Sequence, residues 1–187
     1  MNVMRKVVEV SGYIYRTGLV SGIGGNVSAR QGDEVIITPT MVPLGDVSLR
    51  NLVIVDLDGR VLRGKGPSSE LELHLEIYRR RPDIGGIVHT HSPCARAFSM
   101  AGVRIMKMEG FRDLGTGHIP MVPYHPPGST ELAEACAEGM LKEKAVVLEN
   151  HGTVCGGSDL DEALLLAEFV EESARTQFIA SMLGMEK

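Results

Sequence analysis

Two histidines separated by one residue follow a short apolar run, in Ile84-Gly-Gly-Ile-Val-His-Thr-His91. In an extended strand, residues two apart point to the same face, so His89 and His91 would present both imidazoles on one side of the chain. A third histidine, His151, ends another apolar run. Three neutral imidazoles form a zinc ligand set that leaves a coordination position open, as in catalytic rather than structural sites. The alternative for each histidine alone is an ordinary buried side chain, but three at the ends of apolar runs favour a metal centre, and such a site accepts several divalent metals.

A glycine-rich segment, Ser21-Gly-Ile-Gly-Gly-Asn-Val-Ser28, could hold an anion. Glycines let exposed backbone amides approach a phosphate closely. The same letters are also common in a turn between strands, and this stretch alone leaves both interpretations open.

A second segment, Gly64-Lys-Gly-Pro-Ser-Ser-Glu70, leads into an amphipathic helix with inward Leu71, Leu75 and Tyr78. Ser69 and Glu72 fit a capping box, so local sequence favours simple helix caps for Ser68 and Ser69. A helix N-terminus also suits phosphate, because its amides are unpaired and its potential is positive. The same dipole favours a carboxylate at Glu70 whatever its function.

The elements that must position these residues read as a strand meander followed by strands that alternate with helices. This order indicates an α/β fold with a mostly antiparallel sheet covered by helices on both faces. We expect Gly156-Gly157 to be a turn and Phe178 to face inward from the last helix. The expected strands are 35–39, 52–56, 60–63, 84–91, 145–148 and 153–155, and the expected helices are 3–18, 69–81, 94–101, 129–140 and 159–178.

Composition excludes several classes of function. The 187 residues fit one domain, 1–187, and the formal net charge of −5 argues against nucleic acid, since only Arg79-Arg80-Arg81 is a basic cluster. No apolar stretch reaches the roughly 20 residues that span a bilayer, and the first residues lack a signal-peptide core. Three widely spaced cysteines suit reduced thiols, so we expect a cytoplasmic protein without a membrane partner; they are Cys94, Cys136 and Cys155.

Taken together, the motifs carry a resemblance to a known family. Gly24-Gly-Asn-Val-Ser28, Ile37-Thr-Pro-Thr40, Gly64 to Glu70, His89-Thr-His91 and Asn150-His-Gly152 stand in the order and at the intervals of the zinc-dependent class II aldolases. This family also contains ribulose-phosphate 4-epimerases, methylthioribulose-phosphate dehydratases and the adducin head domain. The resemblance implies a three-layer α/β/α fold and a homotetramer with active sites between subunits.

The resemblance also assigns roles to residues. It places one zinc ion per subunit on His89, His91 and His151, and the general acid/base carboxylate on Glu70, close to the zinc. In this role a pKa raised by burial would help Glu70. Through an ungapped alignment, Asp113 falls near the epimerase's catalytic aspartate and Glu109 near the aldolase's catalytic tyrosine. The substrate's phosphate would be bound by Gly25, Asn26, Thr40, Ser68 and Ser69.

The implied reaction is aldol cleavage of a ketose 1-phosphate, such as fuculose or 5-deoxyribulose 1-phosphate, to dihydroxyacetone phosphate and an aldehyde. Where relatives often have glycine after Thr-Pro-Thr, this chain has Met41, which predicts a different pose of the phosphate. Pentulose-phosphate 4-epimerisation and thiopentulose-phosphate dehydration are alternatives at the same site, and Asp113 is their best support. A non-catalytic, adducin-like module is a further alternative, but that branch is expected to lose the metal ligands that are present here.

Overall fold

The structure is a computed structural model, and it describes residues 3–108 and 117–184. Among these residues, eight strands form one sheet in the order β4-β3-β2-β1-β5-β8-β7-β6. Every neighbouring pair is antiparallel except β6 and β7, which are parallel. The predicted mostly antiparallel sheet is therefore confirmed.

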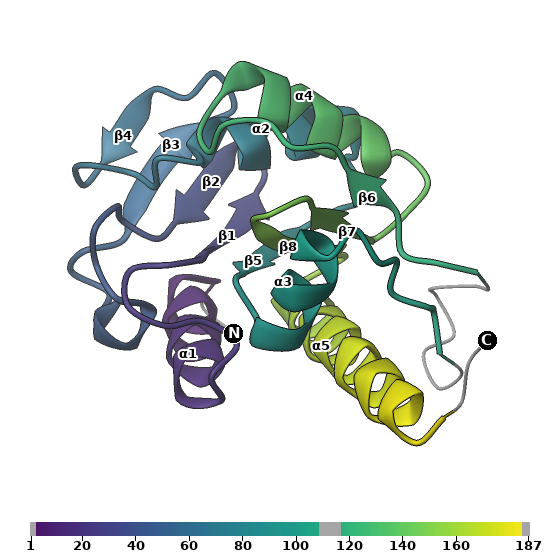
Figure 1. Ribbon diagram of the computed structural model, residues 1–187. Helices are drawn as coiled ribbons and strands as arrows, with labels where there is room; N and C mark the ends of the chain where they lie inside the picture. The colour runs from purple at the N-terminus through teal and green to yellow at the C-terminus, as the bar shows by residue number, and fades with distance from the viewer. Residues whose placement is uncertain (1–2, 109–116, 185–187) are drawn as a thin grey trace.

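The elements follow one another as a meander and then as strands separated by helices (Figure 1). The first half contains α1 (Val3–Arg16), β1 (Asn26–Gln31), β2 (Glu34–Ile37), a short 3-10 helix (Leu44–Asp46), β3 (Val53–Asp56), β4 (Val61–Arg63) and α2 (Leu71–Arg80). The second half contains β5 (Gly86–Thr90), α3 (Pro93–Met100), β6 (Met121–Val122), α4 (Thr130–Gly139), β7 (Ala145–Leu148), β8 (Gly152–Gly157) and α5 (Leu160–Met182).

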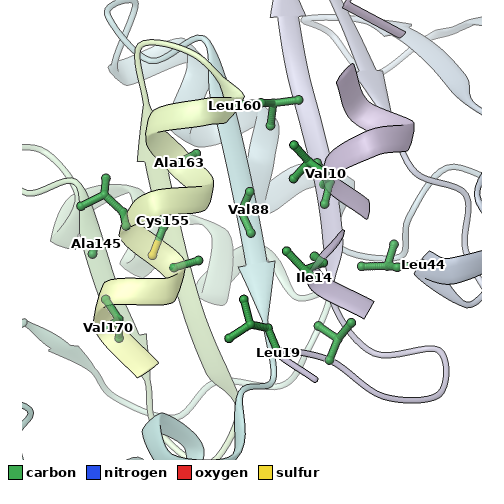
Figure 2. Packing of buried hydrophobic residues seen from close by; sticks show 14 of the residues in the cluster. Val10, Ile14, Leu19, Leu44, Val88, Ala145, Cys155, Leu160, Ala163 and Val170 are labelled. Atoms are coloured by element: carbon green, nitrogen blue, oxygen red, sulfur yellow. The ribbon is translucent and has the colours of Figure 1, made fainter. Parts of the chain in front are cut away.

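Helices cover both faces of the sheet, as predicted. Alternate strand residues divide between two apolar clusters, since successive side chains point to opposite faces. Val88 and Cys155 pack with α1, α3 and α5 on one face, and Figure 2 shows the packing of this cluster around Val88. Ile87 and Val154 pack with α2 and α4 on the other face.

This alternation places the predicted site on the face that carries α2 and α4. His89 is two residues from Ile87 in β5, and Asn26 pairs with His89 across the β1–β5 ladder. Val27, which follows Asn26 in β1, belongs to the apolar cluster on the other face of the sheet. The side chains of His89 and Asn26 consequently lie under the N-terminal half of α2.

Two local predictions are wrong. Gly156 and Gly157 do not turn the chain but complete β8, where the start of α5 lies so close that a Cβ on Gly157 would be 2.6 Å from the Ala163 nitrogen. Phe178 is 51% exposed, because the end of α5 projects past the sheet (Figure 1).

Candidate active site

Three histidines meet where β5 ends beside the turn between β7 and β8. Their ligand atoms all lie within 4.8 Å of one another, and their ring centroids are 4.9 to 5.0 Å apart. His89 lies in β5, His91 immediately follows it, and His151 stands at the turn just before β8. The predicted convergence of His89, His91 and His151 is thus present in the structure.

Backbone geometry brings the turn and the strand end together. Asn150 adopts a left-handed conformation with φ of 59°, which asparagine tolerates better than most residues. The following Gly152 is essential for close approach, because a Cβ there would lie 2.1 Å from the Thr90 carbonyl oxygen. Asn150-His151-Gly152 therefore fits against β5 only with this short, glycine-containing turn.

The donor set fits a divalent metal. The imidazole Nδ1–H of His89 donates to the Thr153 carbonyl at 2.9 Å, so in the neutral ring Nε2 carries the lone pair. That Nε2 faces His91 Nε2 at 3.1 Å. Two nitrogens bound to one tetrahedral zinc lie about 3.3 Å apart. The observed spacing is therefore close to that of two nitrogens that hold one cation.

Glu70 lies directly before α2, beside the histidines. Its Oε2 is 3.1 Å from His89 Nε2, and its Oε1 is 3.4 Å from His151 Nε2. The carboxylate is 6% exposed, and its Oε1 has no hydrogen-bond partner among the described residues. Glu70 therefore combines burial, proximity to two metal-ligand nitrogens and one uncommitted oxygen.

The charge on Glu70 differs from the expectation drawn from burial alone. Burial raises the pKa of this carboxyl, but the imidazoles of His89 and His151 and the amide of Asn26 outweigh it and hold the pKa well below its usual range. A pKa raised by burial, which would help an acid/base group, is therefore not found at Glu70. A metal ion bound by the histidines would lower the pKa of Glu70, as a proton on an imidazole does. Glu70 is therefore a carboxylate at neutral pH.

His91 and His151 remain neutral, as a histidine must be when it binds a metal. Burial lowers the pKa of His91 to about 3 and that of His151 to about 4. Burial alone would also lower the pKa of His89, but the Glu70 carboxylate reverses the effect and raises it. The site thus favours one positive charge between Glu70 and the imidazoles.

A chain of buried hydrogen bonds lies behind Glu70, and the sequence reasoning missed it. The Asn26 amide donates to Glu70 Oε2 at 2.9 Å, and Asn26 Oδ1 contacts His74 Nε2. On the other side of the ring, His74 Nδ1 is 2.6 Å from Ser28 Oγ, which is 2.8 Å from the Tyr78 hydroxyl. The available signal was the i, i+4, i+8 spacing of Glu70, His74 and Tyr78, which places them on one face of a helix.

Three segments that were predicted to bind phosphate lie side by side. The Thr38 amide donates to the Val27 carbonyl at 3.1 Å, and the Ser68 amide donates to the Thr38 carbonyl at 3.1 Å. The Thr40 amide donates to the Gly66 carbonyl at 2.9 Å. Gly25 lies beside β5, where only glycine fits well. Its φ is +73°, and a Cβ there would lie 2.7 Å from the His89 carbonyl oxygen.

An open cavity of about 610 Å³ borders two of these segments, at Pro39-Thr40 and at Gly64 to Gly66. Arg50 and Lys65 line it together with Thr40, and they supply positive charge that the sequence reasoning did not assign. Cations beside hydroxyl groups are suited to a phosphate dianion.

The comparisons with known proteins agree with this geometry. The model of the class II aldolase and adducin N-terminal domain matches residues 5–178. The chain belongs to this family. The resemblance noted in the sequence is thereby confirmed, and this domain carries a three-histidine group that could hold a metal.

Relatives of this chain are named for more than one activity. An L-fuculose phosphate aldolase of Methanococcus maripaludis is 37% identical over 96% of this chain and 98% of that protein. A 5-deoxy-D-ribulose 1-phosphate aldolase of Bacillus thuringiensis is 34% identical over 97% and 87%. A 3-oxo-tetronate 4-phosphate decarboxylase of Haemophilus influenzae is 35% identical over 92% and 85%. A solved L-fuculose 1-phosphate aldolase superposes with a TM-score of 0.92 at 28% identity, covering 98% of this chain and 88% of that one.

The predicted serine caps of this class II aldolase are not observed. The helix α2 begins one residue later than expected, with Glu70 as its N-cap and no side-chain cap hydrogen bond. Ser68 Oγ accepts the Glu70 amide at 3.2 Å, whereas Glu72 pairs with Arg79 at the surface. Ser69 is exposed, and within the described chain no hydrogen bond involves its hydroxyl, so this group remains available to a ligand.

Other predicted residues have different outcomes. Asp113 and Glu109 lie outside the described residues. Met41 has a left-handed backbone with φ of 59°, a conformation that favours glycine, and its side chain is 71% exposed. The three cysteines are free thiols, and burial raises the pKa of Cys136 and Cys155, which is unlike a nucleophile. Among the described residues, no helix is both long and apolar enough to cross a membrane.

The metal-free protein should lose stability on acidification because of His74. Burial, helped by His89, lowers the pKa of this residue to about 3, below the ordinary 6.5 expected when the chain unfolds. The unfolded state therefore binds the proton first as pH falls, and stability that is fully present above about pH 6.5 declines below it. Between about pH 6.5 and 5 this residue contributes a loss of about 2 kcal/mol. Urea unfolding in chelator measures the loss; His74→Gln should flatten the pH dependence, and an equal slope in both proteins would contradict the prediction.

Proposed function

We propose that this protein is a metal-dependent aldolase that cleaves a deoxy-ketose 1-phosphate, such as fuculose 1-phosphate or 5-deoxyribulose 1-phosphate, to dihydroxyacetone phosphate and an aldehyde. The observation that carries the proposal is the position of Glu70. Its carboxylate stands between a three-histidine metal site and three segments suited to a phosphate, with Oε1 uncommitted. A phosphorylated sugar held at both ends would have its reactive carbons beside Glu70.

In the proposed reaction, the bond between C3 and C4 of the ketose breaks. C4 leaves as the aldehyde carbon, and the electron pair stays on C3 as an enediolate of the three-carbon phosphate. The C4 hydroxyl loses its proton to the Glu70 carboxylate as the aldehyde forms, and Glu70 Oε1 then gives this proton to C3, within a site where burial excludes bulk water. Thr40, Ser69, Arg50 and Lys65 hold the phosphate and so orient C3 toward Glu70.

The metal would be held by His89, His91 and His151, and we propose zinc. A bound divalent ion supplies Lewis acidity at the carbonyl and hydroxyl oxygens where negative charge develops, so no lysine Schiff base is needed. His89 is kept in its ligand tautomer by the Thr153 carbonyl.

Cleavage is tested by detection of dihydroxyacetone phosphate from a panel of ketose 1-phosphates with zinc-loaded protein. Release that is abolished by a chelator and restored by metal is the expected result. If no substrate in the panel yields the three-carbon phosphate, the aldolase proposal fails.

Ser69→Ala should weaken substrate binding without slowing chemistry. The Ser69 hydroxyl is exposed and free of internal hydrogen bonds among the described residues, so its loss leaves the fold intact. Loss of one charge-assisted hydrogen bond to phosphate corresponds to about a tenfold rise in KM or more, with kcat nearly unchanged. Steady-state kinetics measures both constants. Ser181→Ala, at the far end of α5, is the matched control, and equal KM values in the two variants would remove Ser69 from the phosphate site.

Decarboxylation of an oxo-acid phosphate is a second candidate, supported by the relative from Haemophilus influenzae. Loss of carbon dioxide from a β-oxo acid also leaves an electron pair beside a carbonyl, so the same metal and acid/base groups could serve. Epimerisation of a pentulose phosphate or dehydration of a thiopentulose phosphate would use the same site as well. Product analysis separates these reactions: carbon dioxide, an epimer or a dehydrated ketone would appear without a three-carbon fragment.

We also propose a homotetramer that works in the cytoplasm. Support for association is the apolar end of α5, where Phe178, Ile179, Met182 and Leu183 are each at least half exposed. An apolar hollow of about 370 Å³ lies beside them, between α3 and α5. Exposed apolar patches of this kind mark interaction sites. Light scattering on purified protein gives the oligomeric state directly, and free cysteines suit the reducing compartment.

A further inference from the structure

We propose that His74 is a positioning residue, which fixes the orientation of the Asn26 side chain and through it holds the Glu70 carboxylate in place. The inference rests on the proposed function, because it assigns His74 to the same acid/base centre. It concerns a buried histidine outside the three-histidine group.

The helix and the strand match each other in spacing. Glu70 stands at the start of α2, and His74 and Tyr78 follow at successive turns. Asn26 and Ser28 are alternate residues of β1 and share the face beneath that helix. The five side chains therefore interleave as Glu70, Asn26, His74, Ser28 and Tyr78.

The direction of every hydrogen bond in this chain follows from the Asn26 amide, whose N–H donates to Glu70 Oε2. A carboxylate only accepts, so the Asn26 group that faces it is Nδ2, and Asn26 Oδ1 faces His74. Neutral His74 must then carry its proton on Nε2 and accept from the Ser28 hydroxyl at Nδ1. Ser28 has given its only proton, so the Tyr78 hydroxyl donates to Ser28. All donors point toward Glu70.

Burial makes orientation, rather than proton delivery, the role of this chain. His74, Ser28 and Tyr78 are 0% exposed, so the far end does not reach water. Burial also raises the pKa of the Tyr78 hydroxyl, which keeps its proton. A chain that ends in a buried tyrosine and passes through a carboxamide is a poor proton path.

Removal of His74 would leave the Asn26 carbonyl oxygen buried without a donor. Asn26 is 5% exposed, and among the described residues its Oδ1 has only the His74 hydrogen bond. An unsatisfied buried acceptor favours rotation of the amide, which would withdraw the N–H that holds Glu70 Oε2. Glu70 would then lose its anchor and no longer present Oε1 in one direction.

The test compares His74→Leu, which removes both ring nitrogens, with His74→Gln, which keeps an N–H donor. Outer-shell partners of metal sites typically contribute 10- to 100-fold in activity, so we expect His74→Leu to lower kcat by about that factor with zinc content unchanged. KM should rise by less than the roughly tenfold effect of a lost phosphate contact. His74→Gln should recover most of kcat, and Ile77→Val, a change in the apolar core on the same helix, should keep it.

A second measurement does not depend on the reaction. In nuclear magnetic resonance of the metal-free protein, the Asn26 side-chain amide should exchange slowly with solvent in the wild type and in Ile77→Val, and rapidly in His74→Leu. If the wild type cleaves no substrate, the proposed function fails, and slow amide exchange that depends on His74 still supports the positioning role.

Unchanged Asn26 exchange in folded His74→Leu would overturn the inference, as would a kcat equal to that of Ile77→Val. If His74→Leu does not fold, Ser28→Ala and Tyr78→Phe provide the same comparison. Ser28→Ala removes the donor that fixes the His74 tautomer, so it should lower kcat more than Tyr78→Phe, which is one step further away. Equal, wild-type kcat in both would overturn the inference.

Discussion

Replacement of His91 by alanine should lower kcat for cleavage by about a thousandfold or more and remove most of the bound metal. Lewis-acid stabilisation by a metal ion is worth several kcal/mol, and each 1.4 kcal/mol is a factor of about ten in rate. His91 contributes one of three nitrogens that converge within 4.8 Å, and its imidazole is already neutral, because burial lowers its pKa to about 3. No proton has to leave this ligand when metal binds at neutral pH.

Metal content after dialysis, kcat, and the shift of Tm on addition of chelator give three measurements of the His91→Ala variant. A ligand that binds only the folded state stabilises it, so chelator should lower the Tm of the wild type and leave that of His91→Ala unchanged. His118→Ala is the control, since His118 is exposed and is not part of the three-histidine group. Full metal content together with full activity in His91→Ala would show that the three histidines do not form the catalytic centre.

The parts of this site that local sequence could predict are those set by periodicity. The i, i+2 spacing of His89 and His91 placed both imidazoles on one face, and the apolar run before His151 ended where a third ligand was needed. The pairing of β1 with β5, which sets Asn26 opposite His89, could not be predicted, because ladders between strands distant in sequence depend on the whole sheet. The family resemblance supplied Glu70, against the local preference for a helix-cap interpretation.

His74 shows why the remaining contacts were not found. On α2 the sequence predicts Tyr78 as an apolar core residue, and it is fully buried. Its hydroxyl and the His74 ring, however, meet polar side chains of β1, which only the packing of α2 over that strand brings within reach. The prediction of a capping box failed for a related reason. Ser69 and Glu72 have the spacing of such a box, but α2 begins at Leu71, and Glu72 pairs with Arg79.

Replacement of Glu70 by glutamine should lower kcat by about a hundredfold to ten-thousandfold while metal remains bound. This is the usual contribution of a general acid/base group. The neighbouring histidines and the Asn26 amide hold the pKa of Glu70 low, so it enters the reaction as a carboxylate that can accept a proton. A glutamine has nearly the same shape and can still accept the Asn26 N–H, but it cannot take up or return a proton.

Exchange of the C3 hydrogen of dihydroxyacetone phosphate with deuterium from solvent tests this proton transfer without the aldehyde. Glu70→Gln should lose the exchange and keep both zinc and affinity for the three-carbon phosphate, since the three histidines and Ser69 are unchanged. Glu72→Gln is the matched control: it alters a carboxylate two residues away whose side chain is 46% exposed and pairs with Arg79, so exchange should continue at the wild-type rate. Persistent exchange in metal-loaded Glu70→Gln would assign proton transfer to another group and leave Glu70 with a role in binding alone.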